Sequence, residues 1–426
     1  MLSHLRGLTT RGRAFLAAGL TALLAGVGLD QPVLLRAGLL VLVLPLLASA
    51  LIGRTGYRLT MSRDIDPPTV PVGQPAQVRL TLANSAAPPR GVLLVEDLVP
   101  YSLGTRPRFF LSGVSREWRR TVDYRLRSEA RGRFTIGPVS VRATDPFGLV
   151  EYARSFRSTS MLTVTPRVVP LRGIPIGGAW TGSGDNRPRA FATGSAEDVT
   201  VREYRRGDDL RRVHWRSSAR VGELMVRREE QPWQSRATIF LDNRIGAHRG
   251  SGISSTFEVA VEAAASIGVH LIHRGFLVRL VTATGENTGP QWHVRDEETN
   301  RRSLLDALAV VGLVERAQLE TSWLVESGHS GTVVAVLGRT TQADSRVLRR
   351  MAAHAGSALA IGLEVDTWVG GTATAAPVSG LGMLGWRAAP YRAKDKLPLV
   401  WEQLGRSGQG TRAAAGTHAG TERGGR

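Results

Sequence analysis

The chain contains no cysteine and almost no lysine. The absence of cysteine excludes disulfides, thiolate metal sites and cysteine nucleophiles. Lys394 and Lys396 are the only lysines among 55 basic residues, so arginine supplies nearly all of the positive charge behind a formal net charge of +19. A basic excess of this size indicates an anionic neighbour, which can be a nucleic acid, a membrane surface or an acidic protein.

Several motifs that hold phosphates or metals are also missing. The Gly-rich stretch 171–198 has no G-x-x-x-x-G-K-[ST] sequence and no G-x-G-x-x-G between a strand and a helix, so we interpret it as a connector. His270 and His273 lie three residues apart on a predicted helix, but no H-E-x-x-H motif accompanies them. We therefore expect surface histidines there, and no zinc.

Two apolar runs stand near the N-terminus, at residues 14–29 and 33–53. Each is close to the lower limit for a membrane span, roughly 17–20 residues. Arginines flank the pair on both outer sides: Arg6, Arg11, Arg13, Arg54 and Arg58. Because positive residues mark the cytoplasmic side, this pattern predicts a transmembrane helical hairpin over residues 1–56, with two spans and the rest of the chain cytoplasmic. The second run argues against a cleaved signal peptide.

The length of 426 residues predicts two or three domains. Residues 57–170 contain alternating apolar stretches with prolines between them, which is typical of strands. The expected strands are 77–84, 91–100, 117–126, 132–145 and 160–168. Their spacing predicts a β-sandwich of immunoglobulin-like type, without the Cys–Trp–Cys core of antibody domains.

From residue 236 the pattern changes to alternating strands and helices. The expected strands are 237–243, 276–283, 331–338 and 357–364, and the expected helices are 255–274, 301–311 and one from Thr341 to Gly356 with Asp344 as capping partner. This alternation predicts an α/β domain over 236–404, with a mostly parallel sheet and helices on both faces. The fold class is therefore α+β multidomain. The tail 405–426 lacks apolar periodicity, and we expect it to be disordered.

Asp242 ends the first strand of this domain, at the edge where open α/β sheets bind ligands. A von Willebrand A-type metal site places Asp-x-Ser-x-Ser there, because Mg²⁺ prefers carboxylate and hydroxyl oxygens. Arg244 and Gly246 stand at the two serine positions in this chain. We therefore interpret Asp242 as a degenerate metal-site position that pairs with a nearby arginine, and we expect neither Mg²⁺ nor another cofactor.

The stretch "REYRRGDDLRRVHWRSSAR" (202–220), within the connector and signature segment 171–235, is the densest cluster of charge. Its pattern predicts a strand over 199–205, a turn, a short helix over 210–219 and a returning strand over 223–230.

Three functions are compatible with this stretch. A hydrolase could use Asp208 or Asp209 with His214 and a serine, although no G-x-S-x-G elbow is nearby. A nucleic-acid site could use the arginines with Tyr204 and Trp215, although four acidic residues lie among the nine arginines of 202–228. We favour an ion-paired junction or interaction surface, since arginine forms bidentate pairs with carboxylates. Whether this segment is purely structural or also receives a partner stays open.

Residues 202–227 resemble the signature of the bacterial family called domain of unknown function 58, roughly R-x-Y-x-x-G-D-x-x-R-x-I-x-W-x-x-S-A-R. The matching residues are Arg202, Tyr204, Gly207, Asp208, Arg211, Trp215, Ser218, Ala219 and Arg220, with Val213 in place of isoleucine. "RGRFTIGP" (131–138) and "DPFGL" (145–149) are similar to the upstream β-region of this family.

The resemblance implies two N-terminal spans, a β-rich segment and a von Willebrand A-like region. It also implies a MoxR-type AAA+ ATPase as partner, often together with a transglutaminase-like membrane protein, and no enzymatic activity. We therefore expect a membrane-anchored adaptor of that ATPase in envelope protein assembly or maturation, without catalytic residues and without nucleic acid as partner. The matching residues named above, together with Asp209, would form its interaction or structural signature.

Overall fold

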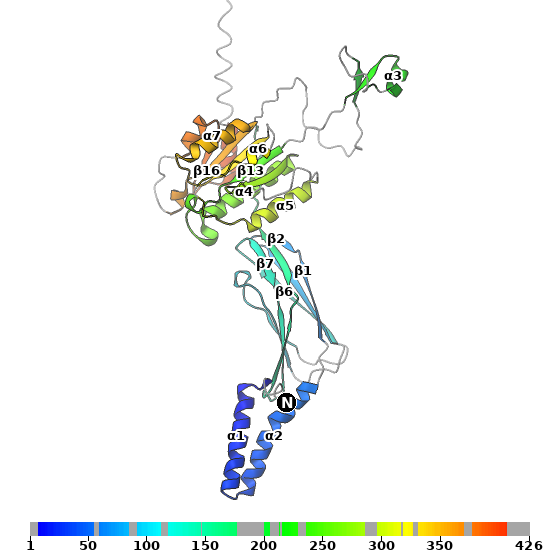
Figure 1. Ribbon diagram of the computed structural model, residues 1–426, viewed down its shortest axis with the longest axis vertical. Helices are drawn as coiled ribbons and strands as arrows, with labels where there is room; N and C mark the ends of the chain where they lie inside the picture. Colours follow the sequence, from blue (N-terminus) through cyan, green and yellow to red (C-terminus); the bar gives the residue numbers. More distant parts are fainter. Residues whose placement is uncertain are drawn as a thin grey trace, which may run out of the picture.

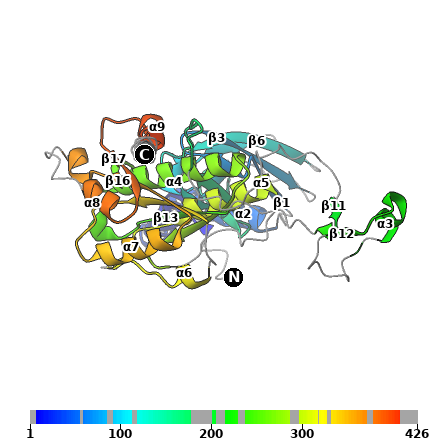
Figure 2. The ribbon, with the colours of Figure 1, turned by 90° about the horizontal axis from the view of Figure 1, so that it is seen from above.

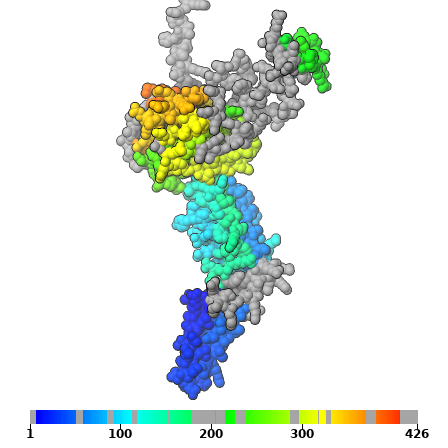
Figure 3. All heavy atoms as spheres, in the orientation of Figure 1, coloured from blue at the N-terminus to red at the C-terminus, as the bar shows by residue number. Residues whose placement is uncertain are grey.

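The structure is a computed structural model, which describes residues 7–54, 59–84, 92–111, 118–145, 147–176, 200–204, 213, 215–228, 236–285, 296–316, 318–326, 331–369 and 377–406. Two N-terminal helices lie at one end, antiparallel strands follow, and a mixed layer of helices and strands lies beyond them (Figure 1). The space-filling view has the same order along the long axis (Figure 3). The predicted tail lies outside the described residues from 407 onward, as does the connector over 177–199.

Helices α1 (Thr10–Gly28) and α2 (Pro32–Arg54) lie side by side (Figure 1). Glycine permits their close approach, since a Cβ on Gly19 would lie 2.8 Å from the backbone nitrogen of Leu42. Among the described helices, one is long and apolar enough to cross a membrane, namely α2 over Pro32–Ala50. Helix α1 carries Arg11 and Arg13 in its first turn, which lowers its mean hydropathy.

The antiparallel strands form three sheets. The first has the order β1 (Leu59–Asp66), β3 (Pro75–Asn84), β6 (Trp118–Arg127). The second has the order β5 (Arg108–Leu111), β4 (Val92–Asp97), β8 (Val139–Thr144), β9 (Glu151–Phe156). The third has the order β2 (Thr69–Pro71), β10 (Ser160–Thr165), β7 (Gly132–Ile136), with β2 parallel to β10.

The first two sheets pack face to face, because alternate side chains of both enter one core. Leu80 and Leu82 of β3 and Val139 and Val141 of β8 belong to this core. A buried ion pair also joins the sheets: Arg63 of β1 and Asp97 of β4 are fully buried, with 2.7 Å between Nη2 and Oδ1.

Several features of this region differ from the sequence prediction, which did not include strands β2, β5 and β9. Strand β1 was not expected, because Arg63 occupies a position on its inner face and interrupts the apolar alternation. The expected single strand 132–145 is two strands, β7 and β8. Gly137 has a φ of +102°, and Pro138 has no amide proton for a ladder, so the strand cannot continue through them.

Beyond residue 235 lies a five-stranded, wholly parallel sheet, which confirms the predicted parallel sheet. Its order is β14 (Leu277–Thr282), β13 (Arg236–Leu241), β15 (Thr332–Leu337), β16 (Ser357–Leu363), β17 (Arg387–Tyr391). Helices α4 (Thr256–His273), α5 (Glu297–Val310) and α9 (Leu397–Arg406) lie on one face, and α6 (Trp323–Glu326), α7 (Asp344–His354) and α8 (Pro377–Met383) lie on the other (Figure 2).

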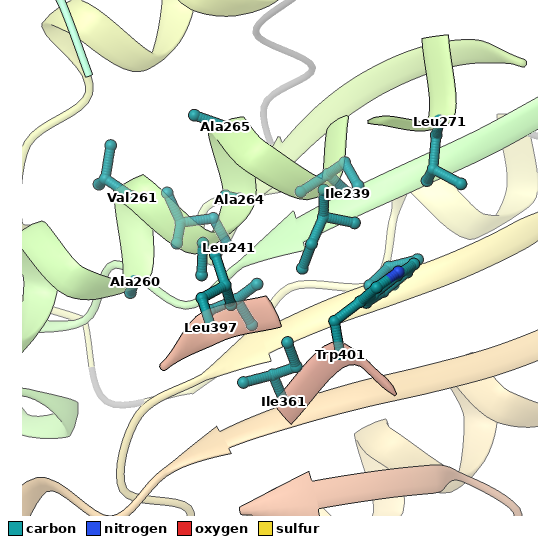
Figure 4. Packing of buried hydrophobic residues seen from close by; sticks show 14 of the residues in the cluster. Ile239, Leu241, Ala260, Val261, Ala264, Ala265, Leu271, Ile361, Leu397 and Trp401 are labelled. Carbon is teal, nitrogen blue, oxygen red and sulfur yellow. The ribbon is translucent and has the colours of Figure 1, made fainter. Parts of the chain in front are cut away.

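The strands of this sheet are buried on both faces. Ile239 and Leu241 of β13 pack against α4 and α9, while Phe240 between them packs on the opposite face. Trp401 of α9 is fully buried in the first of these cores (Figure 4), and its Nε1–H donates to the carbonyl of Arg172 at 2.9 Å. The segment that leaves the antiparallel strands is thereby held along the α/β core.

Some elements of this domain were predicted incorrectly, and α5 begins at Glu297 rather than at residue 301. Strand β17 was missed, because it is short and contains Pro390, which weakens a strand pattern. Helix α7 begins at Asp344 rather than Thr341. The carboxylate of Asp344 nevertheless accepts the N–H and hydroxyl of Thr341, at 2.8 and 3.0 Å, so the two residues do form a capping interaction.

One arginine joins the antiparallel sheets to the α/β layer. Arg131, which precedes β7, donates through Nε to the carbonyl of Leu308 at 2.8 Å and through its other nitrogens to Val311 and to Glu258. Its guanidinium also lies 5.1 Å from the ring centroid of Phe257. Burial lowers the pKa of Arg131, against the opposing charge and hydrogen bond of Glu258. This cation interacts with carbonyls near the end of α5, where the helix dipole is negative.

Candidate functional site

The strand order places a switch point at the carboxyl edge of the parallel sheet. The chain passes from β13 to β14 on one side and returns to β15 on the other, so the connections diverge between β13 and β15. Open α/β sheets bind ligands at such a switch point. Asp242 directly follows β13, and Asp344 lies in the connection that follows β15, so both carboxylates stand at this edge.

Arg244 lies between these two carboxylates and pairs with both. Its Nε and Nη2 donate to Asp242 Oδ1 and Oδ2, each at 2.9 Å. Its Nη1 and Nη2 donate to Asp344 Oδ1 and Oδ2 at 2.8 and 3.3 Å. One guanidinium therefore forms two bidentate pairs, the strongest geometry that arginine offers to carboxylates.

This triad is shielded from water. The side chains of Arg244, Asp242 and Asp344 are 5%, 0% and 3% exposed. Burial by itself lowers the pKa of the Arg244 guanidinium, but the hydrogen bonds and charges of Asp242 and Asp344 raise it well above its ordinary value. The guanidinium therefore stays charged, and a buried charge of this kind is tolerated because its partners are in place.

His248 contacts the backbone of the triad at Asp242. Its Nε2 lies 2.6 Å from the carbonyl oxygen of Asp242, and its Nδ1 lies 3.2 Å from the hydroxyl of Thr256. Because a carbonyl can only accept, Nε2 carries a proton. Burial and the charge of Arg244 lower the pKa of His248, although its contacts with Asp242 oppose that shift.

The loop that carries Arg244 also packs closely against the chain just after β15. The carbonyl of Ala247 accepts the amide of Arg339 at 2.8 Å, just after β15. A Cβ on Gly338 would lie only 2.3 Å from that carbonyl oxygen, so the close approach requires glycine. Asn243 adds a bond from Nδ2 to the carbonyl of Gly312 at 2.8 Å. The chain itself therefore fills the position where a ligand of an open α/β sheet would lie.

The chemistry of this site is that of a fixed ion pair. Mg²⁺ would need oxygen ligands with open positions, and the carboxylates of Asp242 and Asp344 are both engaged by Arg244. Within the part of the chain that the structure describes, no group of three or more His, Asp or Glu side chains is placed to hold a metal ion. Asp242 pairs with its neighbour Arg244. Arg244 has a second partner, Asp344, which the sequence did not indicate.

Residues 200–204 and 215–228 form a small antiparallel hairpin, which is called the signature hairpin below. Strands β11 (Thr200–Glu203) and β12 (Met225–Arg228) are antiparallel, and helix α3 (Trp215–Val221) lies between them in the chain. The helix begins five residues later than predicted. Ser218 fixes its position, because Ser218 Oγ accepts the amide of Met225 at 2.8 Å. Gly222, with a φ of +82°, ends the helix.

The structure places only some of the predicted signature residues. Arg202 lies in β11 opposite Val226, and the amide of Tyr204 donates to the carbonyl of Leu224 at 2.8 Å. Trp215 and Arg220 are exposed on α3. The remaining predicted signature residues, and the histidine of the hydrolase hypothesis, lie outside the described residues: Gly207, Asp208, Asp209, Arg211 and His214.

The two helical histidines do not share an environment. His273 is exposed, and its Nδ1 lies 2.6 Å from a carboxylate oxygen of Glu297. His270 is half-buried, with its ring edge-on to Trp401 at 5.8 Å between centroids. The expectation of two surface histidines was therefore wrong for His270, because α9 packs over it.

Fold and site together define an α+β protein in which Arg244 pairs with two carboxylates at the carboxyl edge of a parallel sheet. Residues 200–308 match the family described as "Protein of unknown function DUF58", which confirms the resemblance found in the sequence. The matched segment spans the signature hairpin, β13, the Arg244 loop, α4, β14 and most of α5. No curated protein matches the chain.

Solved structures match only parts of the chain. A CARDB domain from Pyrococcus furiosus is 12% identical over 26% of this chain and 93% of its own, with a TM-score of 0.19. The alkylpurine DNA glycosylase AlkC of Pseudomonas fluorescens is 17% identical over 30% of this chain and 40% of its own, with a TM-score of 0.17. A β-glucosidase from Listeria innocua is 15% identical over 24% and 16%, with a TM-score of 0.15. These similarities are too small to support any inference about function.

Proposed function

We propose that this chain is a membrane-anchored interaction protein whose signature hairpin binds another protein. The observation that carries this proposal is the exposure of α3, in which no residue is buried. Trp215 is 70% exposed, and Val221 and Leu224 are also exposed. Tryptophan and arginine are enriched among the residues that dominate protein–protein binding, so an exposed tryptophan beside arginines is typical of a binding surface.

The charge of this surface indicates the chemistry of the partner. Arg216 and Arg220 are exposed on the same short helix as Trp215. Interfaces are electrostatically complementary, so the partner would present carboxylates around an apolar pocket. From the family resemblance we propose a MoxR-type AAA+ ATPase as this partner, with a transglutaminase-like membrane protein as a second one. The role would lie in envelope protein assembly or maturation.

Membrane anchoring by both N-terminal helices is part of this proposal. Large apolar side chains are exposed along α1 and α2 where lipid would surround them: Leu20, Leu24, Val27, Val33, Leu39, Leu40, Leu46 and Leu47. Arg11 and Arg13 begin α1 and Arg54 ends α2, at the same end of the helix pair. Positive residues at that end support a cytoplasmic location for the rest of the chain.

We also propose a fold relationship for the antiparallel sheets and for the parallel sheet. The two packed antiparallel sheets would be an immunoglobulin-like sandwich. The parallel sheet would be a von Willebrand A-like domain in which Arg244 takes the place of the metal ion. The position of Asp242 at the end of β13, with Asp344 beside it, supports the second relationship.

No contact within the described residues favours the other two functions. The hydrolase hypothesis uses Ser217 or Ser218, and Ser218 Oγ is engaged by the amide of Met225. The nucleic-acid hypothesis uses Tyr204 and Trp215 as stacking residues. Steeply salt-dependent binding of DNA or RNA would support that hypothesis.

Co-purification tests the proposal. The detergent-solubilised chain should retain the MoxR-type ATPase, and Trp215→Ala should abolish this retention. Tyr101→Ala is the matched control, because Tyr101 is 96% exposed and lies outside the hairpin. Equal retention by the wild type and the Trp215→Ala variant would contradict the proposal.

A further inference from the structure

The turn that links β8 to β9 lies against the two N-terminal helices. This turn, residues 145 and 147–150, is called the DPFGL loop below. The hydroxyl of Thr9 donates to the carbonyl of Gly148 at 2.7 Å, and the amide of Thr9 donates to the carbonyl of Leu149 at 3.0 Å. Leu8 and Val150 form an antiparallel bridge. The loop is therefore attached to the chain just before α1.

Close packing extends this attachment to both helices. A Cβ on Gly12 would lie 2.1 Å from the carbonyl oxygen of Leu149, so glycine is required where α1 meets the loop. Leu149 and Val150 are buried in one small core with Ala48 of α2, and Leu44 packs against it. Side chains of the loop thus reach the sides of both helices.

The described residues of the loop are joined by hydrogen bonds of their own. The carboxylate of Asp145 accepts the amides of Phe147 and Val150, at 3.0 and 2.6 Å. The amide of Gly148 donates to the carbonyl of Asp145 at 3.0 Å, and Gly148 has a φ of +69°. This framework holds Phe147 in place although its side chain is 65% exposed.

The level of the loop along α2 decides what surrounds Phe147. The apolar segment of α2 ends at Ala50, so with a rise of 1.5 Å per residue Ala48 and Leu44 lie about 3 and 9 Å inside that end. Side chains packed against them lie at the boundary between hydrocarbon and headgroups. Phe147 stands two residues before Leu149, so its Cα lies within about 7 Å of it. The headgroup layer has a similar thickness, roughly 5–7 Å on each side.

The surrounding charge matches this location. Arg11 and Arg13 are exposed on the first turn of α1, and Arg11 Nη1 lies 3.7 Å from where a Cβ on Gly148 would be. Arginine at this level attracts anionic headgroups, and aromatic side chains concentrate at the same depth. An exposed phenylalanine beside exposed arginines is thus the composition of a membrane-interface contact.

We propose that the DPFGL loop is a membrane-contact site in which Phe147 inserts among lipid headgroups and the adjoining ends of the acyl chains. The inference rests on the proposed membrane anchoring by α2. The loop holds the adjoining ends of β8 and β9 next to the bilayer, because it connects these two strands. The lipid surface is therefore a further attachment of the antiparallel sheets, in addition to the chain connection after α2 and the contacts of the loop with both helices.

The absence of cysteine makes a direct test possible, because a single introduced cysteine gives one labelling site. The full chain would carry a nitroxide spin label at Phe147→Cys, and would be reconstituted in vesicles of phosphatidylcholine and phosphatidylglycerol. Collision rates with oxygen, which concentrates in the bilayer, and with a water-soluble nickel complex report the depth of the label. Leu40→Cys, in the middle of α2, is the lipid control, and Tyr101→Cys is the water control.

The expected ratio of oxygen to nickel collision rates at Phe147→Cys lies several-fold above that at Tyr101→Cys and below that at Leu40→Cys. A ratio equal to that of Tyr101→Cys, with Leu40→Cys still lipid-exposed, would overturn the loop contact and leave the anchor intact. A label at Phe147 shielded from both reagents would also overturn it, since protein would then cover the site. A water-exposed label at Leu40 would overturn the anchor itself and the loop contact with it.

Discussion

Arg244 forms a bidentate pair with Asp242, two residues before it, with both donor–acceptor distances at 2.9 Å. The pair lies at the carboxyl end of the strand that borders the switch point of the sheet. At this position an open α/β sheet usually offers its carboxylate to a ligand. In this chain the guanidinium of Arg244 neutralises the carboxylate of Asp242, and Asp344 forms a second ion pair with the same guanidinium.

Removal of the guanidinium should destabilise the parallel sheet. Arg244→Ala leaves two buried carboxylates without a counter-charge, which costs about 3–5 kcal/mol. Hydrogen–deuterium exchange of the amides of β13 and β15 in the full chain measures this loss locally. Arg79→Ala is the control, since Arg79 and Asp123 form an exposed pair whose loss should cost less than about 1 kcal/mol. Unchanged exchange in β13 of the Arg244 variant would contradict a stabilising triad.

Arg244 should also prevent Mg²⁺ from binding at this edge. Arg244→Ser leaves the carboxylates of Asp242 and Asp344 beside the hydroxyl of Thr341, all oxygen groups of the kind that Mg²⁺ prefers. Millimolar Mg²⁺ should therefore restore part of the exchange protection in the variant by mass action, and should leave the wild type unchanged. Equal protection of both proteins by Mg²⁺ would show that the cation binds elsewhere.

His248 should make stability fall in mild acid. Burial lowers its pKa below the ordinary value of about 6.5, so just under pH 6.5 the unfolded chain binds a proton that the folded chain does not. The stability from neutral His248 is present above pH 6.5 and is lost as the pH falls through the lower folded pKa.

The variant His248→Gln isolates this contribution, because a glutamine amide can donate to the carbonyl of Asp242 without titrating. The thermal midpoint should drop less between pH 7.5 and 5.5 in the variant than in the wild type. His270, whose pKa is lowered by burial and by the charge of Arg274, remains in both proteins and cancels in the comparison. Identical drops would assign the acid sensitivity to other groups.

The contact between α1 and the DPFGL loop should depend on a single glycine. Gly12→Ala places a methyl group 2.1 Å from the carbonyl oxygen of Leu149, which forces the helix and the loop apart. Amides of residues 147–150 should then exchange faster. Gly28→Ala is the matched control, because a Cβ there meets no atom within 4 Å. Faster exchange in both variants would indicate a general effect on α1.

The regular parts of this fold were predictable from sequence, and the reasons are local. Strands such as β13 and β15 are buried on both faces and form continuous apolar runs, and Ser255 caps α4 within its own segment. Strand β1 escaped prediction because its inner face carries Arg63, whose partner Asp97 comes from another sheet. Alternation cannot reveal an inward arginine whose counter-charge is distant in sequence.

Of the candidate site, the Asp242–Arg244 pair was predictable and the contribution of Asp344 was not, for the same reason. Arg244 stands two residues from Asp242, so their pairing could be inferred from local sequence. Asp344 is 100 residues away from Arg244, and only the strand order brings it to the same edge. Its local role, as capping partner of Thr341, gave no indication of its second role as counter-charge to Arg244.

We propose that the signature hairpin binds a MoxR-type AAA+ ATPase. The dissociation constant between this ATPase and the detergent-solubilised full chain tests it most directly, with Trp215→Ala and Arg220→Glu compared against Tyr101→Ala. Loss of a central tryptophan commonly costs 2 kcal/mol or more, so Trp215→Ala should weaken binding by roughly 30-fold or more. Arg220→Glu should weaken it by reversing a complementary charge, and Tyr101→Ala should leave it unchanged. Wild-type affinity in both the Trp215→Ala and the Arg220→Glu variants would contradict binding of the ATPase by the signature hairpin.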